Sequence, residues 1–130
     1  MDLADLLILK SIPGIGDATV RKIFDEFKFL SISSIDSDKA CEILFSKAYV
    51  RFHNVFRELL PPHTLKQRRL VTNLSIKTIE ENNGTEIIGL SDTRYPRSLM
   101  RLNDAPCVLY ARGNIGLLQN QATIAVVGTR

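Results

Sequence analysis

The stretch SIPGIGDATVRKIF, residues 11–24, decides how the N-terminal half of the chain folds. Apolar residues of helical spacing lie on both sides of its turn, so the stretch predicts two helices joined by a tight connection. Pro13 lacks the amide that a continuing helix needs, and Gly14 tolerates left-handed backbone angles, so the first helix is expected to end here. A second helix is predicted after Gly16, because four apolar residues recur on one helix face: Val20, Ile23, Phe24 and Phe27.

Two helices around a glycine-bounded turn form the pattern of a helix-hairpin-helix unit, with Gly14, Ile15 and Gly16 at the turn. The glycines let the backbone approach a phosphate, and the start of the second helix offers amides of positive partial charge. The charged side chains of that helix are spaced as two i,i+4 ion pairs, Arg21 with Asp25 and Lys22 with Glu26. Two interpretations therefore stay open: the hairpin grips a DNA backbone without reading bases, or it is structural or binds a protein.

The residues after this unit predict a compact helical domain over residues 1–62. Short helices are expected within 37–44 and 52–60, the second because five apolar residues repeat on one face. Pro61 and Pro62 are expected to end the last helix, and the segment PPHT, residues 61–64, is interpreted as a linker.

The second half, residues 63–130, changes character and predicts the opening part of a larger α/β domain. A helix is expected over 65–82, with Asn83-Gly84 as its stop. Strands are expected at 86–90, 107–113 and 123–128, with a brief helix opened by Pro96 between the first two. The run 123–128 is almost wholly apolar, which favours a strand buried on both faces of a parallel sheet. The inward face of the 65–82 helix is expected to carry Val71, Leu74, Thr78 and Ile79.

The charge distribution favours an anionic partner for the second half. The whole chain has a net charge of +3, but residues 63–130 hold nine Lys/Arg and five Asp/Glu, whereas residues 1–62 hold eight and nine. A basic surface is typical of nucleic-acid binding, although it also occurs on ordinary soluble proteins. No apolar run approaches the length of about 20 residues that a membrane helix needs, and no signal pattern opens the chain, so a cytoplasmic location and no membrane contact are expected.

Three motifs follow one another near the C-terminal end. They read Tyr95-Pro96-x-x-Leu99, then D-A-P-x-x-L-Y-x-x-G over residues 104–113, then I-A-V-V-G-x-R over residues 124–130. This ordered set closely resembles the DNA-processing protein A (DprA, or Smf) family, whose central domain has YPxxL, a DxPxxLYxxG segment and an apolar strand ending in GSR. Thr129 stands where the family has serine and keeps the hydroxyl group. Many members of the family also place a helical (SAM-like) helix-hairpin-helix unit ahead of this domain. The resemblance therefore covers essentially the whole chain.

The resemblance implies a Rossmann-like fold for residues 63–130, here incomplete. It also implies a bacterial protein that binds and protects single-stranded DNA during natural transformation and helps to load the recombinase RecA. Only Gly128, Thr129 and Arg130 carry over from the family's DNA site, as the glycine, hydroxyl and arginine of its GSR motif. A homodimer is expected only of the complete protein.

No nucleophile–base pair, metal-ligand spacing or cofactor motif occurs in the sequence, so we expect neither an enzyme nor a cofactor or metal site. Two other functions remain open beside DNA binding. One is a nucleotide-binding or nucleotide-hydrolysing enzyme with a Rossmann-like fold. The other is a helical module that recruits a protein, which the balanced charge of the second helix would suit.

Overall fold

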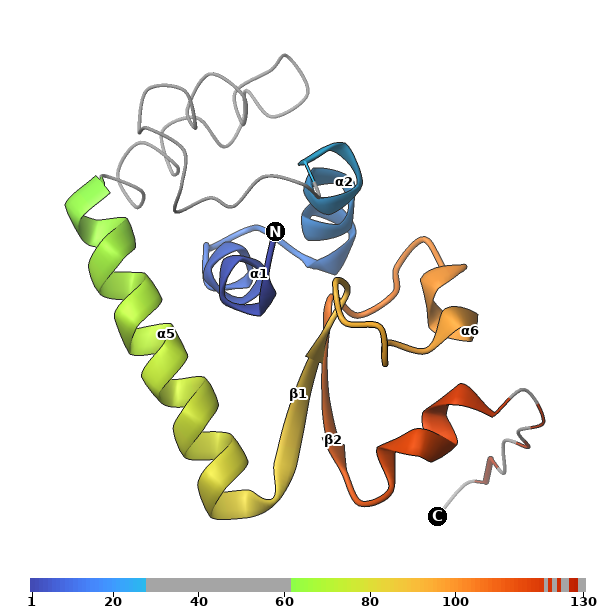
Figure 1. Ribbon diagram of the computed structural model, residues 1–130. Helices are drawn as coiled ribbons and strands as arrows, with labels where there is room; N and C mark the ends of the chain where they lie inside the picture. The colour runs from blue at the N-terminus through green and yellow to red at the C-terminus, as the bar shows by residue number, and fades with distance from the viewer. Residues whose placement is uncertain (28–61, 121, 123, 125–126, 129–130) are drawn as a thin grey trace.

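The computed structural model describes residues 1–27, 62–120, 122, 124, 127 and 128. Within these residues the elements follow one another as α1 (Leu3–Lys10), α2 (Asp17–Phe27), α5 (Pro62–Asn83), β1 (Thr85–Gly89), α6 (Arg97–Met100), β2 (Val108–Arg112) and the short 3-10 helix η3 (Ile115–Gln119). The chain is therefore of a mixed α/β class. Helix α1 contacts α2, α5 and both strands, and so lies at the centre of the described part (Figure 1).

The two N-terminal helices form as the sequence predicts. Asp2 caps α1, because its carboxylate accepts a hydrogen bond from the Asp5 amide and the Asp5 carboxylate accepts one from the Asp2 amide. Gly14 has φ of +82°, the left-handed conformation that the turn requires and that glycine adopts at little cost. In α2, the stripe Val20, Ile23 and Phe24 is buried, so this helix packs on the face that its spacing indicated.

The linker predicted for residues 61–64 was wrong at residues 62–64, because these residues form the first turn of α5, which begins at Pro62. Proline is well suited to the first turn of a helix, where its missing amide has no intrahelical partner. The predicted stop was right: α5 ends at Asn83 and Gly84 follows with φ of +55°. Pro62 is thus a helix start, and the predicted end of a helix before Pro61 lies outside the described residues.

The predicted inward face of α5 was also largely wrong. Leu65 is buried and Ile76 and Ile79 pack against the core, whereas Val71 and Leu74 are 61% and 56% exposed. Thr78 is exposed too, and its hydroxyl donates to the Leu74 carbonyl. Apolar residues lie on more than one side of this helix, so their spacing alone did not identify the side that meets α1 and β1.

A buried ion pair orients α5 on α1. The Asp5 carboxylate is fully buried and accepts from Arg69 Nη1 at 2.7 Å, and Arg69 Nη2 donates to Asp2. A buried carboxylate needs such a partner, because water no longer solvates its charge. This contact fixes which turn of α5 lies beside the start of α1.

Strands β1 and β2 pair antiparallel, with Thr85 opposite Arg112 and Gly89 opposite Val108. Each end of both strands lies one residue from its predicted position. Helix α6 lies in the connection between them; it begins at Arg97, and Pro96 takes the N-cap position. Gly89 allows α1 to approach the sheet, because a Cβ at this position would lie 2.9 Å from Leu6 Cδ1.

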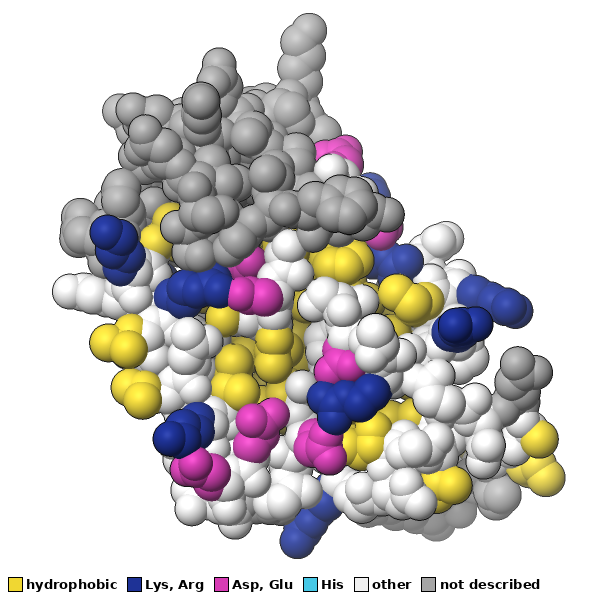
Figure 2. Space-filling model, in the orientation of Figure 1, with side chains coloured by type: hydrophobic (Ala, Val, Ile, Leu, Met, Phe, Trp, Pro, Cys, Tyr) yellow, Lys and Arg dark blue, Asp and Glu magenta, His cyan; other side chains and the backbone are white. Residues whose placement is uncertain are grey.

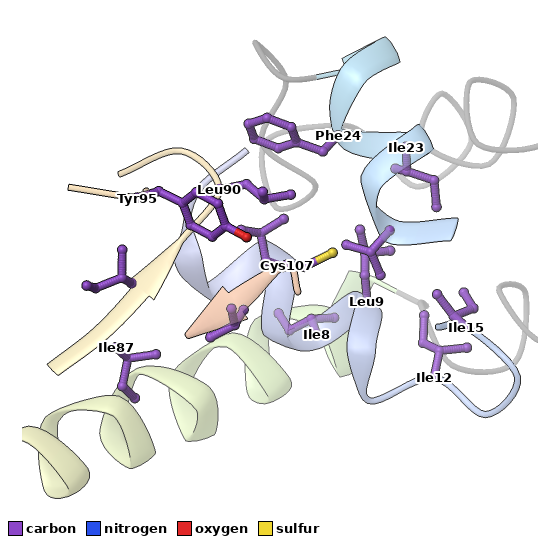
Figure 3. Packing of buried hydrophobic residues seen from close by; sticks show 14 of the residues in the cluster. Ile8, Leu9, Ile12, Ile15, Ile23, Phe24, Ile87, Leu90, Tyr95 and Cys107 are labelled. Carbon is purple, nitrogen blue, oxygen red and sulfur yellow. The ribbon is translucent and has the colours of Figure 1, made fainter. Parts of the chain in front are cut away.

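One hydrophobic core joins the two halves of the described chain. Side chains of α1, α2, α5, β1 and β2 belong to a single cluster, and Figure 3 shows Leu9, Ile12 and Ile23 together with Leu90, Tyr95 and Cys107. The predicted division between residues 62 and 63 stays a prediction, since residues 28–61 lie outside the described part. The helices expected within 37–44 and 52–60 lie there as well.

The C-terminal run does not form the predicted buried strand at the positions that are described. Ile124 and Val127 are 92% and 91% exposed, and neither these residues nor Gly128 are in a strand. A strand buried on both faces needs neighbouring strands and covering helices, and β1 and β2 hydrogen-bond only to each other in the described sheet. Among the described residues, no helix combines the length and the apolar character that crossing a membrane requires.

Candidate nucleic-acid interface

The hairpin residues named from the sequence divide into exposed and buried ones. Gly14 and Gly16 are exposed, but Ile15 is only 6% exposed and belongs to the core. The Ile15 amide donates to the Ile12 carbonyl, and the Gly16 carbonyl accepts from the amides of Thr19 and Val20. The hairpin can therefore present glycine backbone to a ligand, whereas the Ile15 side chain anchors the turn.

The start of α2 is already occupied by a carboxylate. Asp17 Oδ1 accepts a hydrogen bond from the Cys107 amide at 2.9 Å and lies 2.9 Å from Lys10 Nζ. Burial opposes ionisation, but the Cys107 amide and the Lys10 ammonium together hold the pKa of Asp17 below its ordinary value. A negative charge at this helix end competes with any phosphate and neutralises Lys10, so the arrangement disfavours a strong phosphate grip at the hairpin.

The same contact connects the hairpin to the motif residues of the second half. Cys107 Sγ donates to the Asp17 carbonyl at 3.1 Å, and burial, together with the Asp17 charge, raises the pKa of the Cys107 thiol to about 12. Tyr95 is 1% exposed and its hydroxyl donates to the Pro106 carbonyl at 2.5 Å. Tyr95 therefore holds the 104–113 motif in place from the core and is not available to stack on a base.

The residues expected to contact DNA at the C-terminal end are only partly described. Gly128 is exposed, and Thr129 and Arg130 lie outside the described residues. Within the described residues, Gly14, Ile15 and Gly16 form no backbone hydrogen bond with Gly128.

Three cations without an ion-pair partner within the described residues were not among the DNA-contacting residues expected from the sequence. The predicted pair of Arg21 with Asp25 is present at 2.9 Å, but Lys22 has no salt bridge within the described residues. Arg97 and Arg101, at the two ends of α6, likewise have none there. Figure 2 shows Lys and Arg side chains over both α2 and α6. Sequence reasoning missed this group, because its members are about 80 residues apart.

Arg94 shows the opposite arrangement. Its guanidinium donates to Asp92 at 2.7 Å and also to Glu86, and these two carboxylates raise the pKa of Arg94. An arginine held by two carboxylates has few donors left for a phosphate, although it is exposed. Arg94 therefore belongs to the framework of the turn and not to the candidate interface.

A comparison with protein families gives one match for this chain. Residues 86–130 match the sequence model of DNA recombination-mediator protein A. Residues 86–130, the part of the chain that this model matches, are called the DprA segment below. The comparisons with curated proteins and with solved structures find no match.

The match confirms the resemblance over residues 86–130 and indicates a DNA-processing role in recombination. Within the described chain, the DprA segment includes β1 from its second residue, α6, β2 and η3. The hairpin precedes this segment in sequence but is bonded to it through Asp17 and Cys107. In space, therefore, α2 and α6 form one surface, to which the DprA segment and the N-terminal residues both contribute: Arg21 Nη2 donates to the Met100 carbonyl at 3.1 Å.

Proposed function

We propose that this chain is part of a single-stranded DNA-binding protein that protects incoming DNA and helps to load the recombinase RecA in natural transformation. The observation that carries the proposal is the match of residues 86–130 to DNA recombination-mediator protein A. The excess of cations in residues 63–130 supports it, because binding to a DNA backbone depends on Lys and Arg.

The proposal extends to details of fold and action. Residues 1–62 would form the helix-hairpin-helix domain and residues 63–130 the opening part of a Rossmann-like domain that is complete only in a longer, homodimeric protein. The chain would act in the cytoplasm, by binding and without catalysing a reaction. Gly128, Thr129 and Arg130 would contact the DNA backbone, and Gly14 and Gly16 could add backbone amides.

Titration of fluorescently labelled oligo-dT at several salt concentrations, followed by anisotropy, tests this function. We expect the oligonucleotide to bind and excess ATP not to displace it. The oligonucleotide offers many phosphate groups along its backbone, whereas ATP offers only one short triphosphate. Arg130→Ala should weaken binding of all base sequences about equally and reduce the slope of log K against log salt by roughly 0.7.

Lys77→Ala is a matched control, because it removes one positive charge from α5, where Lys77 lies 3.7 Å from Glu81. This variant should leave the slope unchanged. Displacement of oligo-dT by ATP at comparable concentrations would instead support the nucleotide-binding alternative. If neither ligand binds, the remaining alternative is a module that recruits a protein.

A further inference from the structure

A pocket with an excess of positive charge lies between α2 and the turn that follows α6. Its volume is about 420 Å³, within the range of pockets that hold small molecules or parts of larger ones. Its wall comes from two segments, residues 18–25 and residues 100–103. Three cations and one carboxylate line it: Arg21, Lys22, Arg101 and Asp25.

Arg21 is the most buried of these charged residues, with a side chain 18% exposed. Its Nε donates to Asp25 at 2.9 Å and its Nη2 donates to the Met100 carbonyl at 3.1 Å. The third nitrogen, Nη1, is buried and has no acceptor among the described residues. Buried donors nearly always have a hydrogen-bond partner. The hydrogen bonds of Nε and Nη2 hold the guanidinium group, and with it Nη1, in place. It therefore points to an acceptor supplied by a ligand.

Lys22 and Arg101 supply the unneutralised charge. Both are exposed, and neither forms an ion pair within the described residues. Asp25 is the one carboxylate in the pocket and is already bonded to Arg21. Guanidinium groups bind phosphate oxygens in a bidentate manner, and an ammonium adds a mobile point charge. An oxyanion with more than one acceptor oxygen suits this set of donors.

We propose that this pocket binds a phosphate group of the DNA backbone, with Arg21 Nη1 as the fixed donor and Lys22 and Arg101 as flanking cations. That the phosphate belongs to single-stranded DNA rests on the proposed function. That the pocket binds a phosphate group rests only on its charged and hydrogen-bonding side chains. A free nucleotide presents the same group, so the test has to separate the two sources. The inference adds a phosphate contact at a surface shared by α2 and the DprA segment to the contacts proposed for residues 128–130.

The first arm of the test measures phosphate binding without DNA. Inorganic pyrophosphate is titrated into the ¹⁵N-labelled chain, and the expected result is a saturable shift of the Arg21 Nε–H signal and of the Lys22 and Arg101 amides. The double variant Lys22→Ala/Arg101→Ala should abolish these shifts. Both side chains are exposed, so this variant is expected to keep the fold, which the remaining amide spectrum verifies.

The second arm uses oligo-dT and ATP with the same double variant. Its affinity for oligo-dT should fall at each salt concentration, and the salt slope should decrease by roughly 1.4, twice the value for one cation on a single strand. Lys66→Ala/Lys77→Ala removes two cations from α5 and is the control, since a mere effect of net charge would be equal in both variants.

The outcomes separate the two proposals. If the wild-type chain binds oligo-dT and the pocket variant binds it equally well, the pocket proposal is overturned and the proposed function stands. If pyrophosphate and ATP bind in the pocket but oligo-dT does not, the pocket is a phosphate site for a free nucleotide and the proposed function fails. Absence of all binding overturns both.

Asp25→Asn gives a change in the opposite direction. It removes the one negative charge of the pocket but keeps an oxygen that can accept from Arg21 Nε, so oligo-dT affinity should rise, on the order of threefold. A purely structural role for the Arg21–Asp25 pair predicts no gain in affinity, and weaker binding by this variant would contradict the proposal.

Discussion

Asp17 shows how one side chain can serve two distant parts of the chain. It lies in the first turn of α2, where a carboxylate is favourable next to the helix dipole, and that much follows from its position in the sequence. The structure adds that its carboxylate accepts from the amide of Cys107, 90 residues later. Cys107 is fully buried, so without Asp17 its amide would lose this partner.

Asp17→Ala is expected to lower the free energy of unfolding by about 1–3 kcal/mol, the usual cost of leaving a buried donor unsatisfied. Asp17→Asn keeps an oxygen that can accept from Cys107 and should cost less. Urea unfolding followed by circular dichroism measures both. Asp25→Ala is the matched control, because Asp25 is exposed and removal of its pair should cost about 0–1 kcal/mol.

The charge of Asp17 also gives this prediction a pH dependence. Its pKa is lowered in the folded chain, so the charge contributes stability above the unfolded value of about 3.9, and this contribution is lost as the pH falls through the lower folded value. The difference between wild type and Asp17→Asn should therefore be present at pH 7 and vanish in acid. Equal stability of Asp17→Ala and wild type at pH 7 would show that the contact with Cys107 contributes nothing.

At the scale of elements, α5 is the helix whose C-terminal end followed from the sequence, whereas its start and its orientation did not. Its C-terminal stop needs only Gly84, whose left-handed backbone is a local property. Its orientation depends on Arg69, which reaches the carboxylates of Asp2 and Asp5 on α1, and on Leu65, which enters the core. The exposed leucines on the same helix have similar hydrophobicity but no neighbour to cover them.

Leu65→Ala and Leu74→Ala make the same chemical change at a buried and at an exposed position of α5. Leu65 is 5% exposed, and its truncation is expected to cost about 2–5 kcal/mol, whereas Leu74 is 56% exposed and should change the free energy of unfolding by no more than about 0.5 kcal/mol. Chemical denaturation measures both. A larger loss for Leu74 than for Leu65 would mean that α5 turns its other face to the core, as the sequence pattern had predicted.

At the scale of the whole molecule, residues 1–27 and residues 62–120 contribute to one hydrophobic core. Leu6 and Leu9 of α1 and Ile88 of β1 are fully buried in one cluster. Helix α1 is covered by α5 on one side and by the strands on another (Figure 1). Among the described residues, the buried face of α1 thus lies against surfaces that the second half supplies.

Residues 1–62 expressed alone are therefore expected to melt without a cooperative transition, because α1 loses the cover that α5, β1 and β2 provide. The chain of residues 1–130 should melt cooperatively. Thermal scans by circular dichroism at equal concentration compare the two. A cooperative transition of the short chain at the same temperature would contradict this expectation. It would show that residues 1–62 fold independently, as a domain boundary at residue 62 implies.

The sequence by itself determined the local features: where α1 and α5 stop, which stripe of α2 is buried, where the strands β1 and β2 lie, and the resemblance of residues 86–130 to the DprA family. Each of these follows from neighbours within a few positions, through glycine and proline geometry, helical spacing or an ordered motif. The tertiary structure alone decided which face of α5 meets the core, that Asp17 bonds to Cys107, and that Arg21, Lys22 and Arg101 line one pocket. The physical reason is that burial and ion pairing depend on distance in space, and no local pattern encodes which of several apolar or charged side chains a distant segment will cover.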